Sequence, residues 1–202
     1  MAIEVRPAER RDAADLARLI DLAGEGLPSY LWASIAEPGE DAFAVGMRRG
    51  LRDEGGFSWR NAAVAEVGGA VAGALVAYRI GDAPEPLEAL PPMFRPLQEL
   101  ENLAPGSQYV NVLATYPDFR RRGVARRLLA EAEARGAGAR EMSIIVADRN
   151  APAIALYRAS GYIERARRAM VKEGWVCDSG AWVLLAKPLG VAPGLAKPAK
   201  PA

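Results

Sequence analysis

The 202-residue sequence contains no histidine and a single cysteine, Cys177. Without histidine, the chain cannot use an imidazole base, a Ser-His-Asp or Cys-His catalytic arrangement, or a histidine-ligated metal site. One cysteine cannot form an internal disulfide or a thiolate zinc cluster, so nothing in the sequence requires an oxidising compartment. We therefore expect no metal site.

Long apolar runs are also absent. The longest uncharged apolar stretch, Ala70 to Tyr78, is far too short to span a bilayer, and the first residues contain no apolar segment of signal-peptide length. We therefore expect a cytoplasmic protein without a membrane partner. The length and the balanced composition suit one domain over residues 1–187, followed by a flexible tail rich in Pro, Ala and Lys over residues 188–202.

The charge is close to balanced overall but uneven along the chain. Residues 1–110 hold 10 basic and 17 acidic side chains, a net charge of −7, whereas residues 111–202 hold 16 basic and 8 acidic ones, a net charge of +8. If the two halves are also separated in space, a polyanionic ligand is attracted to the second half and a cationic ligand to the first.

Apolar periodicity, broken by glycine and proline, predicts short strands alternating with helices. Asp12 is expected to cap the first helix, and Gly68-Gly69 to form the turn of a hairpin. The expected strands are Ile3 to Val5, Ala62 to Val67, Ala70 to Ile80, Gln108 to Thr115, Met142 to Ala147, Tyr162 to Lys172 and Ala181 to Lys187. The expected helices are Ala13 to Ala23, Pro28 to Ala36, Glu40 to Leu51, Leu97 to Leu103, Gly123 to Arg135 and Asn150 to Ser160.

One stretch leads from a strand through a basic loop into a helix. It contains Arg120, Arg121 and Arg122, followed by Gly123 at the start of the helix. The first N–H groups of a helix have no partner inside it, so they can bind an anion that a glycine allows to approach closely. Residues 117–140 hold seven arginines against three acidic residues, which fits two linked phosphates better than one carboxylate. The spacing of a P-loop or a dinucleotide-binding glycine motif is absent, and an arginine triplet alone would also suit a solvated turn.

Two motifs in this region resemble the GNAT superfamily of acetyl-CoA-dependent N-acetyltransferases. The signature Arg/Gln-x-x-Gly-x-Gly/Ala is matched by Arg120, Gly123 and Ala125, and the run Asn-x-x-Ala-x-x-x-Tyr is matched from Asn150 to Tyr157. The resemblance implies a single α/β (α+β) domain with a mixed, mostly antiparallel twisted sheet of about seven strands. It also implies one splayed parallel pair, helices on both faces, and acetyl-CoA as co-substrate.

The resemblance also implies where acetyl-CoA binds. Its pantetheine arm would lie between the strand that ends in Leu113, Ala114 and Thr115 and the strand over Met142 to Ala147. Asn150 would lie near the same arm, although capping of its helix explains this residue equally well. The residues implied for the pyrophosphate are Arg120, Arg121, Arg122, Gly123, Val124 and Ala125.

The implied chemistry is direct attack of a primary amine on the thioester, with Tyr157 protonating the departing thiolate. Tyr157 also fits the apolar core. A base is harder to find, because the strand before the loop offers only Gln108, Tyr109, Asn111 and Thr115. Proton removal would then pass through water to a more remote carboxylate; we take Glu25 as the catalytic candidate, with Asp21 and Glu101 as further possibilities.

Acceptor binding is expected from Glu25, Tyr30, Trp32 and Asn111, which combine a carboxylate with aromatic faces suited to an amine. The acceptor would be a small-molecule amine or a peptide or protein amine, and the acidic first half favours a cationic one. A non-catalytic acyl-CoA-binding or regulatory module is the alternative. Nucleic acid is disfavoured because few aromatic residues accompany the arginines. A homodimer could form through the strand Ala181 to Leu185.

Overall fold

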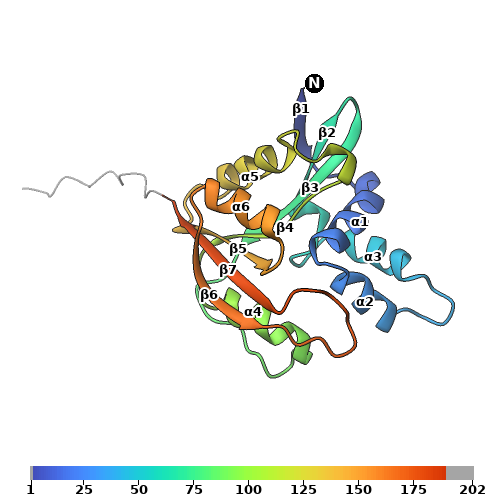
Figure 1. Ribbon diagram of the computed structural model, residues 1–202. Coiled ribbons are helices and arrows are strands. Elements are labelled where there is room, and N and C mark those ends of the chain that lie inside the picture. The colour runs from blue at the N-terminus through green and yellow to red at the C-terminus, as the bar shows by residue number, and fades with distance from the viewer. Residues whose placement is uncertain (1, 190–202) are drawn as a thin grey trace, which may run out of the picture.

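The computed structural model describes residues 2–189, in which seven strands form one mixed sheet in the order β1-β2-β3-β4-β5-β7-β6 (Figure 1). Neighbouring strands are antiparallel except for the parallel pair β4 and β5. This is the predicted mixed sheet. The strands are β1 (Ile3–Pro7), β2 (Ala62–Val67), β3 (Ala70–Arg79), β4 (Gln108–Thr115), β5 (Glu141–Ala147), β6 (Ile163–Ala169) and β7 (Ala181–Pro188).

Helices cover both faces of the sheet, because side chains that alternate along the strands are apolar in both directions. In β7, Val183 and Leu185 face α5 and α6, whereas Trp182 and Leu184 face α4. Helices α1 to α3 pack beside β2 to β4 on the α4 side (Figure 1). The helices are α1 (Ala13–Ala23), α2 (Leu27–Ser34), α3 (Ala42–Gly50), α4 (Arg95–Glu101), α5 (Val124–Arg135) and α6 (Ala151–Ala159), with 3-10 turns at Arg10–Asp12, Trp59–Asn61, Pro92–Phe94 and Pro117–Phe119.

The predicted elements agree with these bounds to within a few residues. Gly68 and Gly69 have φ angles of +63° and +81°, which confirms the hairpin turn that only glycine adopts freely. The strand expected over Tyr162 to Lys172 is shorter and ends at Ala169. No helix within residues 2–189 is long and apolar enough to cross a bilayer. Most of the predicted tail, residues 190–202, lies outside the described residues.

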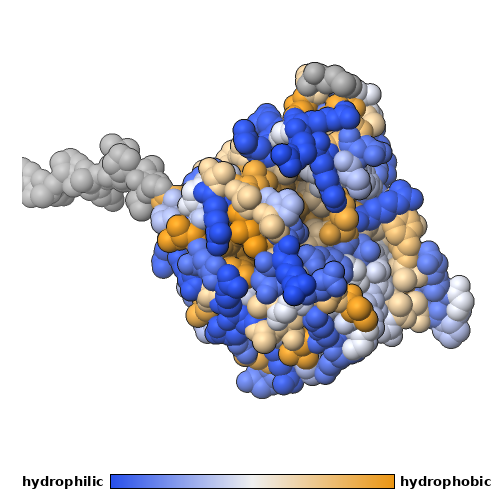
Figure 2. Space-filling model, viewed as in Figure 1, coloured by the Kyte–Doolittle hydropathy of each residue, from blue (hydrophilic) through white to orange (hydrophobic). Residues whose placement is uncertain are grey.

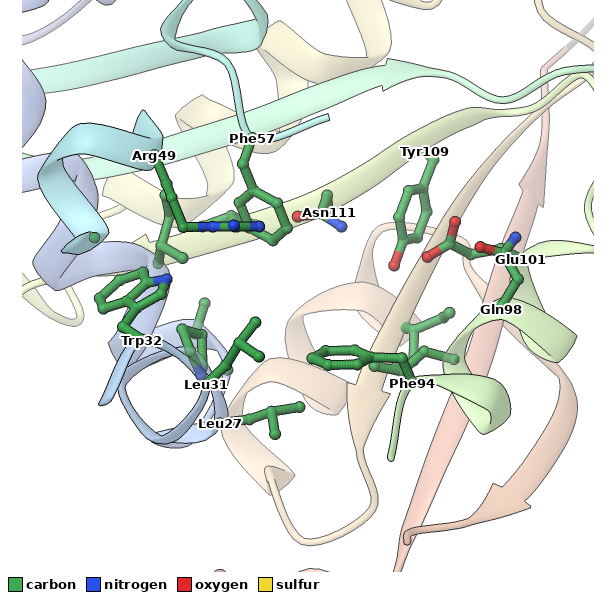
Figure 3. A pocket seen from close by; sticks show the side chains of 18 of the residues that line it. Leu27, Leu31, Trp32, Arg49, Phe57, Phe94, Gln98, Glu101, Tyr109 and Asn111 are labelled. Carbon is green, nitrogen blue, oxygen red and sulfur yellow. The ribbon is translucent and has the colours of Figure 1, made fainter. Parts of the chain in front are cut away.

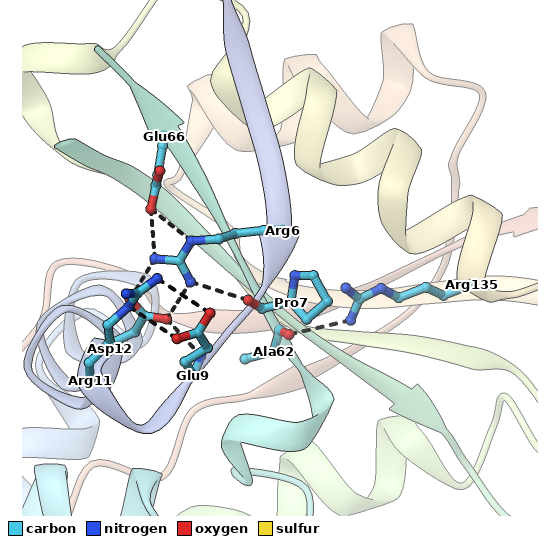
Figure 4. Close-up of polar contacts among 8 residues, drawn as sticks. All are labelled: Arg6, Pro7, Glu9, Arg11, Asp12, Ala62, Glu66 and Arg135. Carbon is cyan, nitrogen blue, oxygen red and sulfur yellow. Dashed lines mark hydrogen bonds and ion pairs between the residues drawn. The ribbon is translucent and has the colours of Figure 1, made fainter. Parts of the chain in front are cut away.

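Asp12 does not cap α1 as predicted, because stronger partners hold its carboxylate (Figure 4). It accepts hydrogen bonds from the Arg6 guanidinium at 2.7 and 2.9 Å and from the Glu9 amide at 2.7 Å. Arg6 also pairs with Glu66 of β2 at 2.6 Å. Burial alone would raise the pKa of Asp12, but the Arg6 and Glu9 hydrogen bonds outweigh burial and lower it. The network ties β1 and β2 to the start of α1.

The strand Ala181 to Leu185 cannot join two copies edge to edge, so that prediction is wrong. It lies in β7, and β5 and β6 occupy both of its edges. The chain doubles back after β6 and inserts its last described strand inside the sheet. The edge strands of this sheet are β1 and β6.

Candidate active site

Strands β4 and β5 run side by side for a short distance and then separate. Their ladder begins at Gln108 and Met142 and ends at Val110 and Ile144. Beyond this point β4 continues to Thr115 paired only with β3, and β5 continues paired only with β7. The facing edges of both strands therefore keep unpaired backbone groups, which an extended ligand with amide groups can engage as a partial strand.

The separation begins at a β-bulge in β4. Val76 of β3 pairs with Val112 of β4, and the next residue, Ala77, pairs with Val110. Asn111 is therefore an extra residue of β4 without a partner in the ladder. Asn111 donates through Nδ2 to the Tyr78 hydroxyl at 3.4 Å. Its buried Oδ1 accepts no hydrogen bond from the described residues. A buried acceptor that lacks a partner requires an explanation, and a ligand donor at this position would supply one.

The loop that joins β4 to α5 presents free backbone N–H groups. Its backbone is left-handed at Arg121, with φ of +62°, and at Gly123, with φ of +90°; such a conformation is uncommon for arginine and often marks a functional loop. Gly123 is the N-cap of α5, and no side chain of the described residues caps this helix. The first N–H groups of α5 are therefore free to bind an anion.

The arginines of this loop are not neutralised. None of Arg120, Arg121 and Arg122 forms an ion pair within residues 2–189. Arg120 donates to the Thr115 carbonyl at 3.4 Å, and Arg122 lies over the Phe119 ring at 5.6 Å from its centroid. Hydrophilic side chains gather over the segment that leads into α5, and a hollow with an apolar floor opens beside them (Figure 2). This end of β4 suits a polyanionic ligand.

Helix α6 carries the second sequence motif. Asn150 caps it, because its Oδ1 accepts a hydrogen bond from the Ala153 amide at 3.3 Å. Tyr157 is 4 % exposed and packs in the core beside Tyr162, with ring centroids 6.0 Å apart. Burial raises the pKa of Tyr157 well above its ordinary value, so the phenol stays protonated and can donate a hydrogen bond. Capping is confirmed for Asn150, whereas a cofactor contact stays a prediction.

A pocket of about 320 Å³ lies on the other face of the sheet, among α1 to α4 (Figure 3). It reaches Asn111 of β4 and Ile145 of β5, which are the first residues beyond the last β4–β5 pair. The pocket and the separated strands therefore meet. Its walls are mostly apolar and aromatic, and they include Leu27, Leu31, Trp32, Phe57, Phe94 and Trp182.

Two ionisable side chains enter this pocket from different helices. Glu101, at the end of α4, lies beside the Tyr109 hydroxyl (Figure 3), and burial raises the pKa of Glu101 to about 7 although Tyr109 acts to lower it. Arg49 enters from α3 at the opposite end of the view (Figure 3). A carboxyl group that titrates near neutral pH inside a pocket is suited to proton transfer.

The structure separates the four residues expected to bind the acceptor. Trp32 and Asn111 line the pocket, whereas Glu25 and Tyr30 do not. Glu25 lies in the α1–α2 turn, where its carboxylate accepts a 3.4 Å hydrogen bond from Ser179 and burial raises its pKa. The Tyr30 hydroxyl donates to the Glu173 carbonyl at 2.6 Å. Both residues attach α2 and its preceding turn to the β6–β7 connection.

Sequence reasoning did not single out Arg49. It follows Val45 by four residues and Gly46 by three, and both of these are buried in α3, so the three lie on the same side of the helix. An arginine within an apolar stripe was the available signal. Tyr109 and Glu101 were noted in the sequence, but their proximity depends on how α4 packs against β4.

Comparisons with known proteins show what the chain is similar to. The model of the Acetyltransferase (GNAT) family matches residues 26–162, and no curated protein matches the chain. A solved structure described as an acetyltransferase is 16% identical over 92% of this chain and 98% of its own, with a TM-score of 0.63. An N-acetyltransferase from Staphylococcus aureus Mu50 is 18% identical over 91% and 99%, with a TM-score of 0.61. The NatC complex bound to Gag peptide and CoA is 18% identical over 94% and 99%, with a TM-score of 0.56.

Proposed function

The chain belongs to the GNAT acetyltransferase family, and from that premise we propose that it transfers an acetyl group from acetyl-CoA directly to a primary amine. The observation that carries the proposal is the meeting of two sites across the sheet. An anion-binding loop leads to the separated edges of β4 and β5 on one side, and a pocket reaches the same separation at Asn111 and Ile145 on the other. Two substrates bound on opposite sides of the sheet can therefore meet in the gap between β4 and β5.

The cofactor side fits coenzyme A through both charge and backbone. We assign the pyrophosphate to the loop and first turn of α5, where each charge-assisted hydrogen bond contributes about 1.5–3 kcal/mol. The backbone of β4 beyond Asn111 would pair with the amides of the pantetheine arm. The NatC complex, a relative in fold, was solved with CoA bound. The assigned residues are Leu113, Ala114, Thr115, Arg120, Arg121, Arg122, Gly123, Val124, Ala125 and Asn150.

We assign the general base to Glu101. It lines the pocket, and the pKa of its carboxyl group is about 7. Asp21 is engaged elsewhere, because its carboxylate accepts a hydrogen bond from the Ser29 amide in the first turn of α2 at 2.8 Å. The catalytic role predicted for Glu25 stays a prediction, since this residue lies outside the pocket lining. Glu101 would take a proton from the acceptor ammonium directly or through one water.

The transfer then balances without an acyl-enzyme intermediate. The amine nitrogen forms a bond to the acetyl carbon, and the carbon–sulfur bond breaks. Tyr157, whose phenol stays protonated because burial raises its pKa, would donate the proton that neutralises the departing thiolate, and the second proton that the amine nitrogen loses would return to Tyr157. The unpartnered edge of β4 at the bulge provides backbone groups beside the reacting carbonyl.

Acetyl-CoA consumption across amine classes tests the proposal. The purified chain is mixed with acetyl-CoA and a panel of primary amines, and released CoA thiol is measured after subtracting the signal of Cys177. We expect saturable CoA release with at least one class and binding of CoA by calorimetry. Binding without release for every amine would favour the non-catalytic module, and absence of CoA binding would refute both readings. We also propose a cytoplasmic location, which the single cysteine supports.

A further inference from the structure

The pocket on the α1 to α4 face is charged differently at its two ends. Glu101 and the Tyr109 hydroxyl lie at one end, and the Arg49 guanidinium projects in from the other, with Asn111 between them in the view (Figure 3). Apolar and aromatic side chains, including Leu31 and Phe94, form the walls between these ends. The pocket therefore combines a carboxyl group, an apolar middle and a cation.

Arg49 has no anionic partner within residues 2–189. It forms no ion pair there and its guanidinium donates no hydrogen bond to a described residue, and burial together with the like charges of Arg52 and Arg48 lowers its pKa. Its neighbour Arg48, by contrast, is exposed and pairs with Glu40 at 3.1 Å. A half-buried guanidinium without a counter-ion is unfavourable, and a ligand carboxylate would relieve it by two parallel hydrogen bonds.

Glu101 presents the opposite requirement. Its carboxyl group pairs with no cation of the described residues, and the groups that face it, Tyr109 from β4 and Tyr78 beyond it from β3, are neutral phenols. An ammonium at this end would be paired by Glu101 and could donate to the unpartnered Asn111 Oδ1. Asn111 stands where β4 leaves β5, so an amine held here is next to the thioester path.

We infer, on the basis of the proposed function, that the acceptor is a small amino acid-like zwitterion. Its primary amine lies at Glu101 and Asn111, an apolar or aromatic body fills the pocket, and its carboxylate pairs with Arg49. A volume of about 320 Å³ is at the lower end of the range of small-molecule sites. It suits a free amino acid better than an extended peptide, whereas the expectation of a cationic acceptor stays a prediction.

Matched acceptors test this inference with the wild-type chain. Apolar and aromatic amino acids are each compared with their carboxamide and their decarboxylated amine, at saturating acetyl-CoA. We expect kcat/KM to be roughly ten- to a hundred-fold higher for the carboxylate, since a charge-assisted pair is worth about 1.5–3 kcal/mol. Short peptides with the same N-terminal residue should be poorer acceptors.

Arg49→Gln then removes the proposed carboxylate partner. KM for the amino acid should rise to that of its carboxamide, while KM for the carboxamide stays unchanged. Arg48→Gln, on the same helix, is the matched control and should alter neither value. Arg49→Lys keeps the charge without the planar fork and should restore part of the preference. CoA binding by calorimetry shows whether each variant is folded.

The outcomes separate this inference from the proposed function. If carboxylate, carboxamide and decarboxylated amines turn over equally, or if Arg49→Gln slows all three alike, the zwitterion assignment is wrong although acetyl transfer stands. Better turnover of peptides than of amino acids would also overturn it. If no amine of any class releases CoA, the proposed function itself is wrong.

Discussion

Replacing Glu101 with glutamine tests whether this carboxyl group is the base. The structure gives it a pKa of about 7 because burial disfavours its charged form, whereas an exposed glutamate titrates near 4.3. The titratable groups that face it, Tyr78 and Tyr109, have pKa values raised by burial and stay neutral over this range. Any change of kcat/KM between pH 5 and 8 at this end of the pocket would therefore come from Glu101.

The size of the effect follows from that pKa. Below pH 7, the deprotonated fraction falls about tenfold per pH unit, so roughly a tenth of the carboxyl groups are active at pH 6. The wild-type kcat/KM should therefore show an acidic limb with a midpoint near 7. Glu101→Gln should lower kcat/KM by about 10²- to 10⁴-fold and abolish that limb.

Stability provides an independent readout of the same group. A carboxyl pKa that is higher in the folded state means that the wild type loses stability as the pH rises from about 4 through about 7. The shift corresponds to about 4 kcal/mol at most. Glu101→Gln should therefore melt at a higher temperature than the wild type at pH 8, and the difference should vanish near pH 4.

The assay is CoA release over pH 5 to 9, combined with thermal melting of both proteins. Glu99→Gln is the matched control, since Glu99 lies on the same helix but pairs at the surface with Arg168. Acetyl-CoA affinity should not change in either variant. If the acidic limb near pH 7 persists in Glu101→Gln, or if the wild type lacks it, Glu101 is not the base.

Four further substitutions have defined outcomes. Arg121→Gln and Arg122→Gln should each raise the calorimetric Kd for CoA about tenfold, because each removes a charge-assisted contact to the pyrophosphate; unchanged affinity would contradict the assignment of this loop. Tyr157→Phe should lower kcat about 10²-fold or more with CoA affinity intact, and an unaltered kcat would restrict Tyr157 to packing. Asp12→Asn should reduce the free energy of unfolding by about 2 kcal/mol, measured by denaturant titration. The stability contributed by Asp12 is present above its unfolded pKa of about 3.9 and should disappear as the pH falls through its lowered folded value; equal stability of both proteins at pH 7 would contradict this.

Much of the fold could be predicted from local pattern. The strand over Gln108–Thr115, the Gly68-Gly69 hairpin and the helix after Gly123 are set by neighbours in sequence, and local preference is what periodicity and turn residues report. The basic loop before α5 was predicted for the same reason, because a glycine, a basic triplet and a helix start are contiguous.

The mispredictions arise where other partners take the group or the edge that a local pattern assigns elsewhere. Asp12 suits a helix cap, but Arg6 and the Glu9 amide bind its carboxylate more strongly. The strand Ala181 to Leu185 comes last among the predicted strands and looks like an edge, yet it inserts between β5 and β6. The competition for Asp12 is local, since Arg6 and Glu9 precede it by six and three residues, whereas the position of β7 in the sheet has no signal in the residues beside it.

The pocket among α1 to α4 shows the same limit. Arg49 lies in α3, far along the chain from Glu101 at the end of α4 and Asn111 in β4, and only the packing of α3 and α4 on the sheet brings the three around one space. No local sequence pattern marks these three side chains as pocket residues. The β-bulge at Asn111 is equally hidden, because a bulge is a property of two paired strands.

A crystal structure of the chain with CoA tests the central claim most directly. We predict that the pyrophosphate contacts the backbone amides between Arg121 and Ala125, and that the pantetheine arm lies between β4 and β5 with its thiol directed toward Asn111. CoA bound elsewhere, or an arm that leaves the separation of these two strands unoccupied, would contradict the account.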